Sequence, residues 1–349
     1  MAFYDGTKLL SQLDLNGKKP ELYLCTTNRT GGKTTFFSRM IVKRFLKTGE
    51  KFCLLYRYKY ELDDVANAFF KDIGALFFPD YQMESKREMN GMFQSLHLIK
   101  AGEKKSKPCG YAIAINSADT IKKRSHLFQD ATCILFDEFQ SETNHYCTDE
   151  INKFISIHTS LARGNGKQVR YLPAYLLSNT VTILNPYYVA LGVSGRLRDD
   201  TKFLKGDGFV LEQGFVESAA KALKDSSFNR AFAKSNYVNY ASQAVYLNDN
   251  LAFLEKPNGQ GRYIATLKDG GTHFSIWEYR DQGVMYCDSA ADLYFPLKIA
   301  VTTEDHNVNY VMLKSYVGFV ETMRDLFNRG CFRFRNLACK NAVLHLLSY

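Results

Sequence analysis

The segment TNRTGGKT, residues 27–34, has the composition of a loop that folds around an anion. Gly31 and Gly32 let the backbone approach the anion closely, and the start of the following helix presents unpaired N–H groups to it. Lys33 is the residue type that reaches the β- and γ-phosphates in such loops, and a hydroxyl at Thr34 is a magnesium ligand. The segment therefore predicts a phosphate-binding loop.

One position departs from the P-loop pattern G-x-x-x-x-G-K-[ST], which begins with glycine where this chain has Thr27. The alternative interpretation is a lysine at an exposed helix start that binds no ligand. The candidate cofactor-binding residues are those of the whole loop: Thr27, Asn28, Arg29, Thr30, Gly31, Gly32, Lys33 and Thr34.

Two adjacent acids end an apolar strand further along the chain, in ILFDE, residues 134–138. Burying two carboxylates at a strand end without a cation is costly. In a P-loop enzyme, Asp137 is expected to hold magnesium through water and Glu138 to polarise the attacking water. The alternatives are an acidic pair in a solvated loop and an aspartate that caps the next helix. Because both motifs follow their own strands in the right order, the sequence predicts binding of ATP and Mg²⁺.

Two further residues fit such a site. Asn179 follows Ser178 at the end of the next apolar strand, where a polar side chain can contact the γ-phosphate or the water; a simple strand-to-turn cap is the alternative. Arg163 lies in LARGNGK at the end of a helix, where it can reach the nucleotide of a neighbouring subunit. The alternative for Arg163 is a surface arginine favoured by the helix dipole.

The elements that position these residues alternate between strand and helix in the first half of the chain. Helices are expected at residues 33–47, 61–74 and 149–162. The expected strands are near-continuous apolar runs at residues 21–27, 51–58, 110–116, 132–138 and 174–180. This alternation predicts an α/β fold with a mostly parallel sheet covered on both faces.

The pattern changes after about residue 200. Residues 218–235 are expected to form a helical connector, and KDGG and DQG turns between β-rich runs predict an antiparallel meander. Helices are expected at about 310–328 and 337–347. We therefore predict a P-loop ATPase domain at 1–200, a helical linker at 201–240 and a smaller α+β domain at 241–349.

Composition limits the class of protein. The 349 residues include 45 Lys and Arg against 36 Asp and Glu, a net charge of +9 that favours a polyanionic partner. The eight cysteines show no zinc-site spacing, and several that lie within apolar runs, such as Cys25 and Cys133, are expected to be buried in a reducing compartment. No secretory signal is evident, and no apolar run reaches the about 18 residues needed to span a membrane. A cytosolic protein is therefore expected.

Five motifs in order resemble the genome-packaging ATPases of small Picovirinae-type podophages, relatives of the large-terminase motors. The motifs are TNRTGGKT, YRYKYEL, TCILFDEF, LARGNG and LLSNTVTILNPYY. The resemblance covers residues about 20–190 and continues weakly beyond. It implies the additional-strand, catalytic-glutamate type of P-loop fold. It also implies a homopentameric ring at the portal vertex of an empty capsid, which pumps double-stranded DNA inward.

The resemblance assigns roles residue by residue. Lys33 and Thr34 match the phosphate and magnesium ligands, and Asp137 and Glu138 match the Walker B acid and the catalytic glutamate. Three arginines also match: Arg29 an arginine inside the P-loop, Arg163 the trans-acting arginine finger, and Arg124 a second basic residue that faces the neighbour's site. Thr27 departs from the family pattern.

The resemblance implies a ribonuclease H-like fold for the second domain. In terminases this domain is a nuclease with clustered acids, but the candidate first strand here, GRYIATL, carries no acid. Asp288 and the pair Glu304–Asp305 do not make an evident metal cluster, so nuclease activity is not expected. We interpret the domain as a vestigial nuclease used for docking, on the portal directly or through a structural RNA, or for nucleic-acid contact.

Basic residues in predicted loops are candidate DNA contacts, because a ring motor needs sequence-indifferent contacts to phosphates. They are Lys59, Lys104, Lys105, Lys107, Lys122 and Lys123. Each cluster alone is more typical of a solvated face. Arg333 and Arg335 alternate with phenylalanines, which favours a half-buried strand with a charged outer face over a nucleic-acid or portal contact.

The sequence thus predicts an ATP-driven translocase of double-stranded DNA that works in the host cytoplasm and transiently at the portal. Two alternatives remain. A helicase or another P-loop motor would share the site and act on single strands. A non-hydrolysing structural adaptor would not need Glu138.

Overall fold

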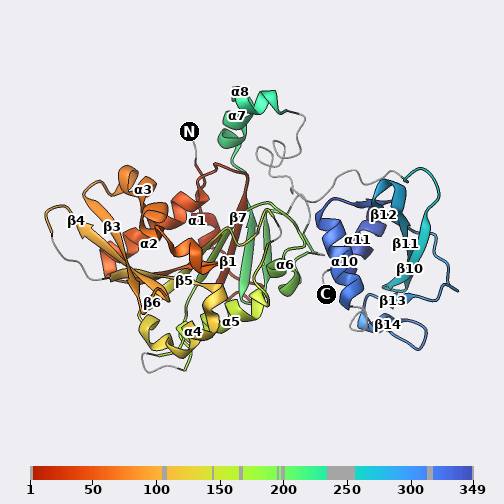
Figure 1. The fold of residues 1–349 in the computed structure, drawn as a ribbon, viewed down its shortest axis with the longest axis horizontal. Helices are drawn as coiled ribbons and strands as arrows, with labels where there is room; N and C mark the ends of the chain where they lie inside the picture. The colour runs from red at the N-terminus through yellow and green to blue at the C-terminus, as the bar shows by residue number, and fades with distance from the viewer. Residues whose placement is uncertain are drawn as a thin grey trace. The chain divides into compact units, whose positions relative to one another are not determined.

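The structure is a computed structural model that describes residues 3–103, 108–143, 145–164, 168–194, 196–197, 201–233, 256–312 and 317–347. These residues form two compact units (Figure 1). Each unit has its own hydrophobic core. Unit 1 comprises residues 1–180 and 200–244, and unit 2 comprises residues 181–199 and 245–349. Each unit is described by itself.

Unit 1 is built on a sheet of nine strands among the described residues, in the order β3-β4-β5-β2-β6-β7-β1-β9-β8. The strands are β1 (Leu22–Thr27), β2 (Lys51–Tyr56), β3 (Tyr81–Glu88), β4 (Phe93–Lys100), β5 (Pro108–Ala114), β6 (Ala131–Asp137), β7 (Ala174–Asn179), β8 (Phe203–Gly206) and β9 (Phe209–Gln213). Neighbours in the series β5-β2-β6-β7-β1-β9 pair in parallel. At one edge β3 and β4 form an antiparallel hairpin, and β4 pairs antiparallel with β5. At the other edge β8 pairs antiparallel with β9. The predicted mostly parallel sheet is confirmed.

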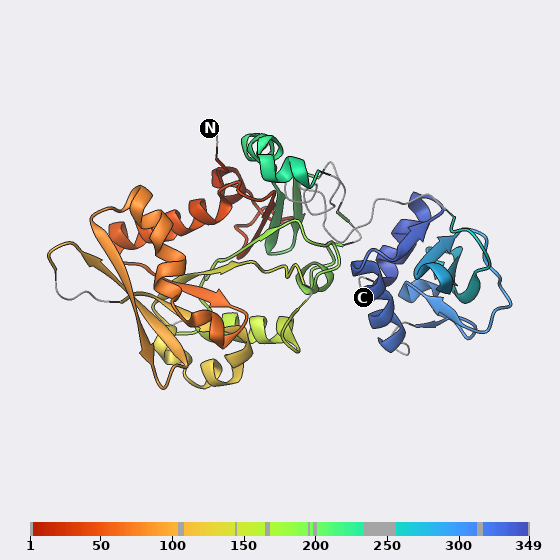
Figure 2. The same ribbon diagram turned by 45° about the horizontal axis from the view of Figure 1, so that its top comes forward.

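Helices cover both faces of this sheet. The helical elements of unit 1 are α1 (Thr7–Leu10), α2 (Lys33–Thr48), η1 (Lys59–Leu62), α3 (Val65–Phe77), η2 (Ile115–Ser117), α4 (Ala118–Lys123), η3 (Ser125–Phe128), α5 (Glu150–Leu161), α7 (Glu217–Asp225) and α8 (Ser227–Ala231). The helices α2 and α3 lie on one face, with α4 and α5 on the other (Figure 2). Gly49 ends α2 in a left-handed conformation, with φ of 74° and its N–H donating to Phe45 O.

Strands β8 and β9 correct the predicted helical linker at 201–240. Their turn carries Asp207-Gly208, a dipeptide typical of two-residue hairpins, and β9 adds to the sheet beside β1. The carboxylate of Asp14 fixes the turn by accepting from the N–H of Gly208 at 3.1 Å. Helices occupy only the later part of the range, where α7 and α8 meet at Ser226.

Unit 2 contains a sheet of six strands among its described residues, in the order β14-β13-β10-β11-β12-β15. The strands are β10 (Arg262–Asp269), β11 (Thr272–Tyr279), β12 (Val284–Asp288), β13 (Lys298–Ala300), β14 (Val311–Met312) and β15 (Phe332–Phe334). The antiparallel pairing of β10 with β11 and of β11 with β12 confirms the predicted meander. The predicted smaller α+β domain is therefore present.

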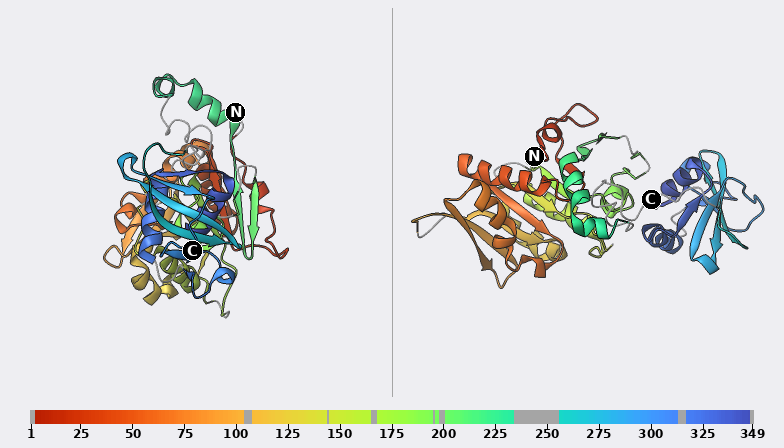
Figure 3. Two further views of the ribbon diagram at one scale, coloured as in Figure 1. Left: turned by 90° about the vertical axis from the view of Figure 1, so that its right-hand side faces the viewer. Right: turned by 90° about the horizontal axis from the view of Figure 1, so that it is seen from above.

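Two helices, α10 (Val317–Asn328) and α11 (Leu337–Leu347), pack on one face of this sheet (Figure 3). The helix expected at 310–328 is shorter in the structure, because Val311–Met312 pair with β13 as β14. The other helical elements are α6 (Pro186–Ala190), η4 (Arg280–Gln282) and η5 (Thr303–Asp305). Within the described residues, no group of three or more His, Cys, Asp or Glu side chains is placed to hold a metal.

The segment 181–199 differs from its predicted place in the first domain. Ile183 and Leu184 are buried in the core of unit 2. The hydroxyl of Thr182 donates to Asn328 Oδ1 in α10 at 2.9 Å. Burial of these apolar side chains thus places the first boundary at residue 180 rather than near 200. In the described part of the chain, no helix has the length and apolar character needed to cross a membrane.

Candidate nucleotide-binding site

The phosphate loop, the acidic pair and Asn179 meet where β1, β6 and β7 end. These strands are parallel, with β7 between β6 and β1, so their carboxyl ends lie at one edge of the sheet. Binding sites of open α/β sheets form at this edge. The phosphate loop follows β1, the acidic pair follows β6, and Asn179 ends β7.

Lys33 is the first residue of α2 and is almost fully buried. Its Nζ donates to Asn179 Oδ1 at 2.7 Å. Burial lowers the pKa of Lys33, and the negative charge of Asp137 opposes that shift. Asn179 therefore contacts the phosphate-loop lysine, and its role as a polar sensor stays a prediction.

Thr34 and Asp137, the two predicted magnesium ligands, are in direct contact. The Thr34 hydroxyl donates to Asp137 Oδ2 at 2.7 Å. Burial raises the pKa of Asp137, and the positive charge of Lys33 opposes that shift. A hydroxyl and a carboxylate on adjacent elements are the hard oxygen ligands that Mg²⁺ prefers, so these residues fit the metal.

Glu138 has a left-handed backbone, with φ of 59°, which is uncommon for a residue other than glycine. Desolvation, followed by the negative charges of Asp137 and Glu142, raises the pKa of its carboxyl group. Its carbonyl accepts from Arg57 Nη2 at 3.3 Å, and the same nitrogen donates to Phe139 O at 2.8 Å.

Arg57 was not among the residues singled out from the sequence, although it lies in the YRYKYEL motif. It directly follows β2, and its Nε donates to both carboxylate oxygens of Glu150, at 3.1 and 2.9 Å. The two side chains are 8% and 1% exposed, so the ion pair is buried. A buried arginine needs a partner, but the sequence alone does not identify Glu150 as that partner.

The backbone conformation of the loop explains why threonine can stand at position 27, where the P-loop pattern has glycine. The residues with positive φ in the loop are Thr30 and Gly32, at 59° and 93°. Thr27 is instead a regular strand residue, and its hydroxyl donates to Asn28 O at 2.9 Å. Glycine is therefore not required at the first position of this loop.

Other residues of the phosphate loop contact the segments that follow β9 and β6. Asn28 makes two hydrogen bonds with the backbone of Val216, from Nδ2 to the carbonyl at 3.1 Å and from the N–H to Oδ1 at 2.9 Å. Arg29 forms an ion pair with Glu142 in the segment after β6. A Cβ on Gly31 would lie 3.0 Å from Val216 Cγ2, which leaves little room for a side chain there.

The predicted trans-acting arginine, Arg163, lies away from this group. Arg163 is exposed just after α5, and a Cβ on the next residue, Gly164, would meet the Gln129 side chain shortly before β6 begins. Arg163 therefore lies at the opposite edge of the sheet from the phosphate loop of its own chain. Arg124 is exposed at the end of α4, with Nη1 at 3.6 Å from Met89 Sδ.

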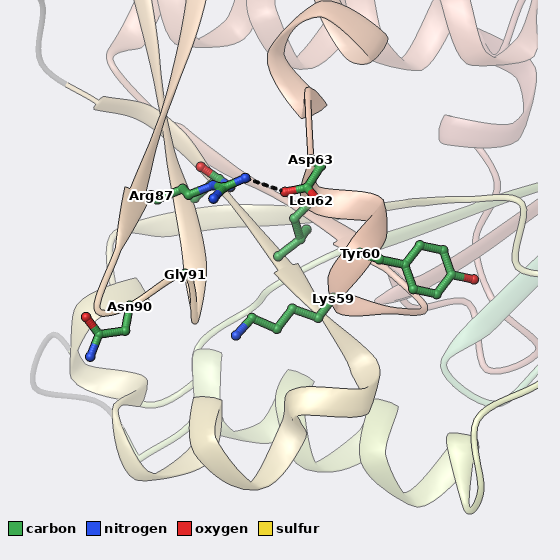
Figure 4. Close-up of a pocket in the computed structure, with 8 residues that line it drawn as sticks. Lys59, Tyr60, Leu62, Asp63, Arg87, Asn90 and Gly91 are labelled. Atoms are coloured by element: carbon green, nitrogen blue, oxygen red, sulfur yellow. Dashed lines mark hydrogen bonds and ion pairs between the residues drawn. The ribbon is translucent and has the colours of Figure 1, made fainter.

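The candidate DNA contacts are only partly described. Lys59 begins η1 and lines a pocket of about 650 Å³ with Tyr60, Arg87 and Asn90, in which Arg87 donates to Asp63 Oδ1 at 2.9 Å (Figure 4). Lys122 and Lys123 are exposed in the last turn of α4. The remaining candidates, Lys104, Lys105 and Lys107, lie outside the described residues.

Comparison with known proteins shows the family of the chain. The family model of the podovirus DNA encapsidation protein (Gp16) matches residues 2–348. The chain belongs to this family. The DNA packaging proteins of Bacillus phages phi29 and PZA are each 24% identical to it over 319 residues, 90% of this chain and 90% of each relative. The DNA packaging protein of Bacillus phage B103 is 23% identical over 311 residues, 87% of this chain and 89% of the relative.

Two solved structures share the fold of nearly the whole encapsidation protein. The bacteriophage phi29 genome packaging motor assembly covers 97% of this chain and 96% of its own, with a TM-score of 0.52 and 22% identity. The phi-28 gp11 DNA packaging motor covers 99% and 98%, with a TM-score of 0.53 and 17% identity. The resemblance to packaging ATPases of small podophages is thus confirmed at the level of family and fold.

Proposed function

We propose that this encapsidation protein is an ATPase that drives double-stranded viral DNA into a procapsid. The observation that carries the proposal is the meeting of three strand ends in one group, Lys33 with Asn179 and Thr34 with Asp137. A phosphate loop alone supports binding, whereas a loop joined to an acidic pair supports hydrolysis.

Each residue has a role in the proposed reaction. The backbone N–H groups at the start of α2 bind the phosphates, and the ammonium of Lys33 offsets the charge on the β- and γ-oxygens. Asn179 orients that ammonium and would contact the γ-phosphate of a bound nucleotide. Thr34 and Asp137 would hold Mg²⁺, which supplies positive charge beside the phosphates.

Glu138 is the proposed general base. Its raised pKa improves its ability to accept a proton from the attacking water. The left-handed backbone and the Arg57 contact fix where the carboxylate can point. A purely structural adaptor has no use for this arrangement.

We propose Arg163 as the residue that completes the site of a neighbouring subunit. Its exposed position on the far edge of the sheet fits a contact with another copy rather than with its own loop. An arginine finger of this kind contributes about 10³–10⁵ in rate. Arg124 is the proposed second basic residue at that subunit boundary, in a homopentameric ring.

The remaining roles follow from family membership. We propose that exposed lysines of unit 1, including Lys59, Lys122 and Lys123, contact the DNA backbone. Unit 2 is proposed to be a nuclease-like domain without nuclease activity that docks on the portal, directly or through a structural RNA. The protein would act in the host cytoplasm and transiently at the portal vertex.

The test is steady-state ATP hydrolysis, with and without double-stranded DNA, by the wild-type chain, Glu138→Gln and Arg163→Ala. The proposal expects DNA-stimulated turnover that both variants lose. Mixing Glu138→Gln with Arg163→Ala is expected to restore part of it, because each supplies what its neighbour lacks. Nucleotide binding without turnover under any assembly condition would favour a structural adaptor, and strand separation would favour a helicase.

A further inference from the structure

A second pocket of unit 1 lies next to the phosphate loop, where its lining residues Phe3 and Val216 adjoin Gly32 and Gly31. Its volume is about 550 Å³, and its lining comes from the N-terminal segment and from the residues after β9. Phe3 and Phe215 are the lining residues with exposed rings, at 70% and 56% exposure. Exposed phenylalanine rings facing one pocket indicate a ligand with an apolar, flat face.

Both aromatic residues flank the two glycines of the phosphate loop. A Cβ on Gly32 would lie 3.4 Å from Phe3 Cβ, so Phe3 sits against the loop itself. Phe215 adjoins Val216, which contacts Gly31 and binds the Asn28 side chain. The pocket that Phe3 and Phe215 line is therefore next to the glycines that would bind the phosphates.

Sheet topology sets the direction in which a bound nucleotide extends. Strand β1 has β7 and then β6 on one side and β9 on the other. The contacts of Lys33 with Asn179 and of Thr34 with Asp137 place the terminal-phosphate end on the β6 and β7 side. The other end of the nucleotide extends to the β9 side, where the pocket lies.

A pocket on the acidic side is the alternative place for the base. That pocket, of about 260 Å³, is lined by Thr34, Asp137 and Glu138. A base there would exclude the attacking water from Glu138. The site of hydrolysis and the site of the base therefore belong on opposite sides of the loop.

The N-terminal segment is held in position rather than free to leave. Tyr4 is buried, its N–H donates to Gly31 O at 2.8 Å, and its hydroxyl donates to Glu212 Oε2 in β9 at 2.6 Å. Its ring also packs against Phe36 and Phe37 of α2. These contacts fix Phe3 beside Gly32 before any ligand binds, which lowers the entropy cost of binding.

We infer that this pocket binds the base of the nucleotide, with Phe3 and Phe215 as stacking residues for a purine. The inference rests on the proposed nucleotide site and adds residues that recognise the nucleoside rather than the phosphates. Lysines and acids, among them Lys8 and Glu217, form the polar rim, which provides partners for the sugar and the base edge.

Calorimetric binding of two probes to the full chain separates the two parts of the site. ADP carries both base and phosphates, whereas inorganic triphosphate carries phosphates alone. Phe3→Ala and Phe215→Ala are each expected to weaken ADP binding about tenfold, the effect of removing one stacked ring. Both variants are expected to bind inorganic triphosphate as the wild type does, which also shows that they fold.

Controls make the result specific. Phe228→Ala removes an equally exposed ring on α8, outside the pocket, and is expected to leave ADP binding unchanged. Phe3→Tyr and Phe215→Tyr keep the ring and are expected to retain wild-type affinity. Unchanged ADP affinity in both alanine variants would overturn the inference. Unchanged binding of both probes in Lys33→Ala would instead overturn the proposed nucleotide site.

Discussion

The two acids that end β6 are adjacent in sequence but are held in different ways. Asp137 accepts hydrogen bonds from the Thr34 hydroxyl and from the N–H of Glu138. Glu138 is held through its backbone, by a left-handed φ and by Arg57. Hydrogen bonds thus fix the carboxylate of Asp137, the proposed metal ligand, whereas those named here fix only the backbone of Glu138, the proposed general base.

Glu138→Gln tests this division of roles. The change keeps the shape of the side chain and removes its negative charge. General-base catalysis contributes about 10²–10⁴ in rate, so kcat is expected to fall by that factor while ADP affinity measured by calorimetry stays the same. A fall in ADP affinity of similar size would contradict the assignment, because it would place Glu138 in binding.

The pH dependence of hydrolysis provides a second test at this scale. Because the carboxyl of Glu138 must be ionised and its pKa is raised, kcat is expected to fall with decreasing pH at a higher pH than for an ordinary glutamate. The charge of Glu142 contributes to that shift. In Glu142→Gln the acidic limb of the kcat profile should therefore move to lower pH. An unmoved limb would mean that another group titrates.

At the scale of elements, the buried pair Arg57–Glu150 joins the end of β2 to the start of α5 beneath the acidic pair. Removing one partner of a buried pair leaves an uncompensated charge and costs about 3–5 kcal/mol. Arg57→Ala is expected to lower the free energy of unfolding in urea by that amount.

The exposed pair Arg87–Asp63 is the matched control for Arg57→Ala. Its side chains are 71% and 67% exposed, and exposed pairs contribute about 0–1 kcal/mol. Arg87→Ala should therefore leave the unfolding free energy almost unchanged. Equal effects of the two substitutions would contradict the expectation that breaking the buried pair costs more than breaking the exposed one.

The sequence predicted the elements whose signals are local. The apolar runs of β1, β2, β6 and β7 and the glycine-rich turn before α2 are in place. The hairpin of β3 and β4 was not predicted, because β3 is mostly exposed and polar, and the buried strand β4 mixes polar residues with apolar ones. Strands β8 and β9 were missed although Asp207-Gly208 marks their turn.

Pairings between distant residues could not be predicted in the same way. The motifs identified Lys33, Thr34, Asp137 and Asn179, because their residue types carry phosphate chemistry. Nothing in the local pattern connects Arg57 to Glu150 or Tyr4 to Glu212, since only the fold brings these pairs together. The roles of Arg163 and Arg124 stay predictions that depend on a neighbouring subunit.

At the scale of the whole molecule, unit 2 is discontinuous in sequence. The chain leaves unit 1 after β7, contributes residues 181–199 to unit 2, and returns to form β8 and β9. The core of unit 2 therefore depends on a segment that separates two strands of the other sheet. A cut at residue 245 would not release a complete second domain.

Leu184→Ala tests that dependence. Leu184 is 2% exposed within the unit 2 core, and truncating a buried leucine costs about 2–5 kcal/mol. The substitution should lower the unfolding transition of unit 2 and leave that of unit 1 in place. Adding ADP identifies the unit 1 transition, because a ligand stabilises the unit that binds it. Leu293→Ala, at a position 49% exposed, is the control and should change neither transition.

The same discontinuity has a consequence for the order in which the protein folds on the ribosome. Residues 181–199 emerge after β7 and before β8, while the strands and helices that bury Ile183 and Leu184 lie beyond residue 245 and are still unmade. Unit 1 can close its sheet once β9 has emerged, but these apolar residues stay uncovered until translation is almost complete. Nascent chains that stop between residues 214 and 317 should therefore bind holding chaperones through this segment.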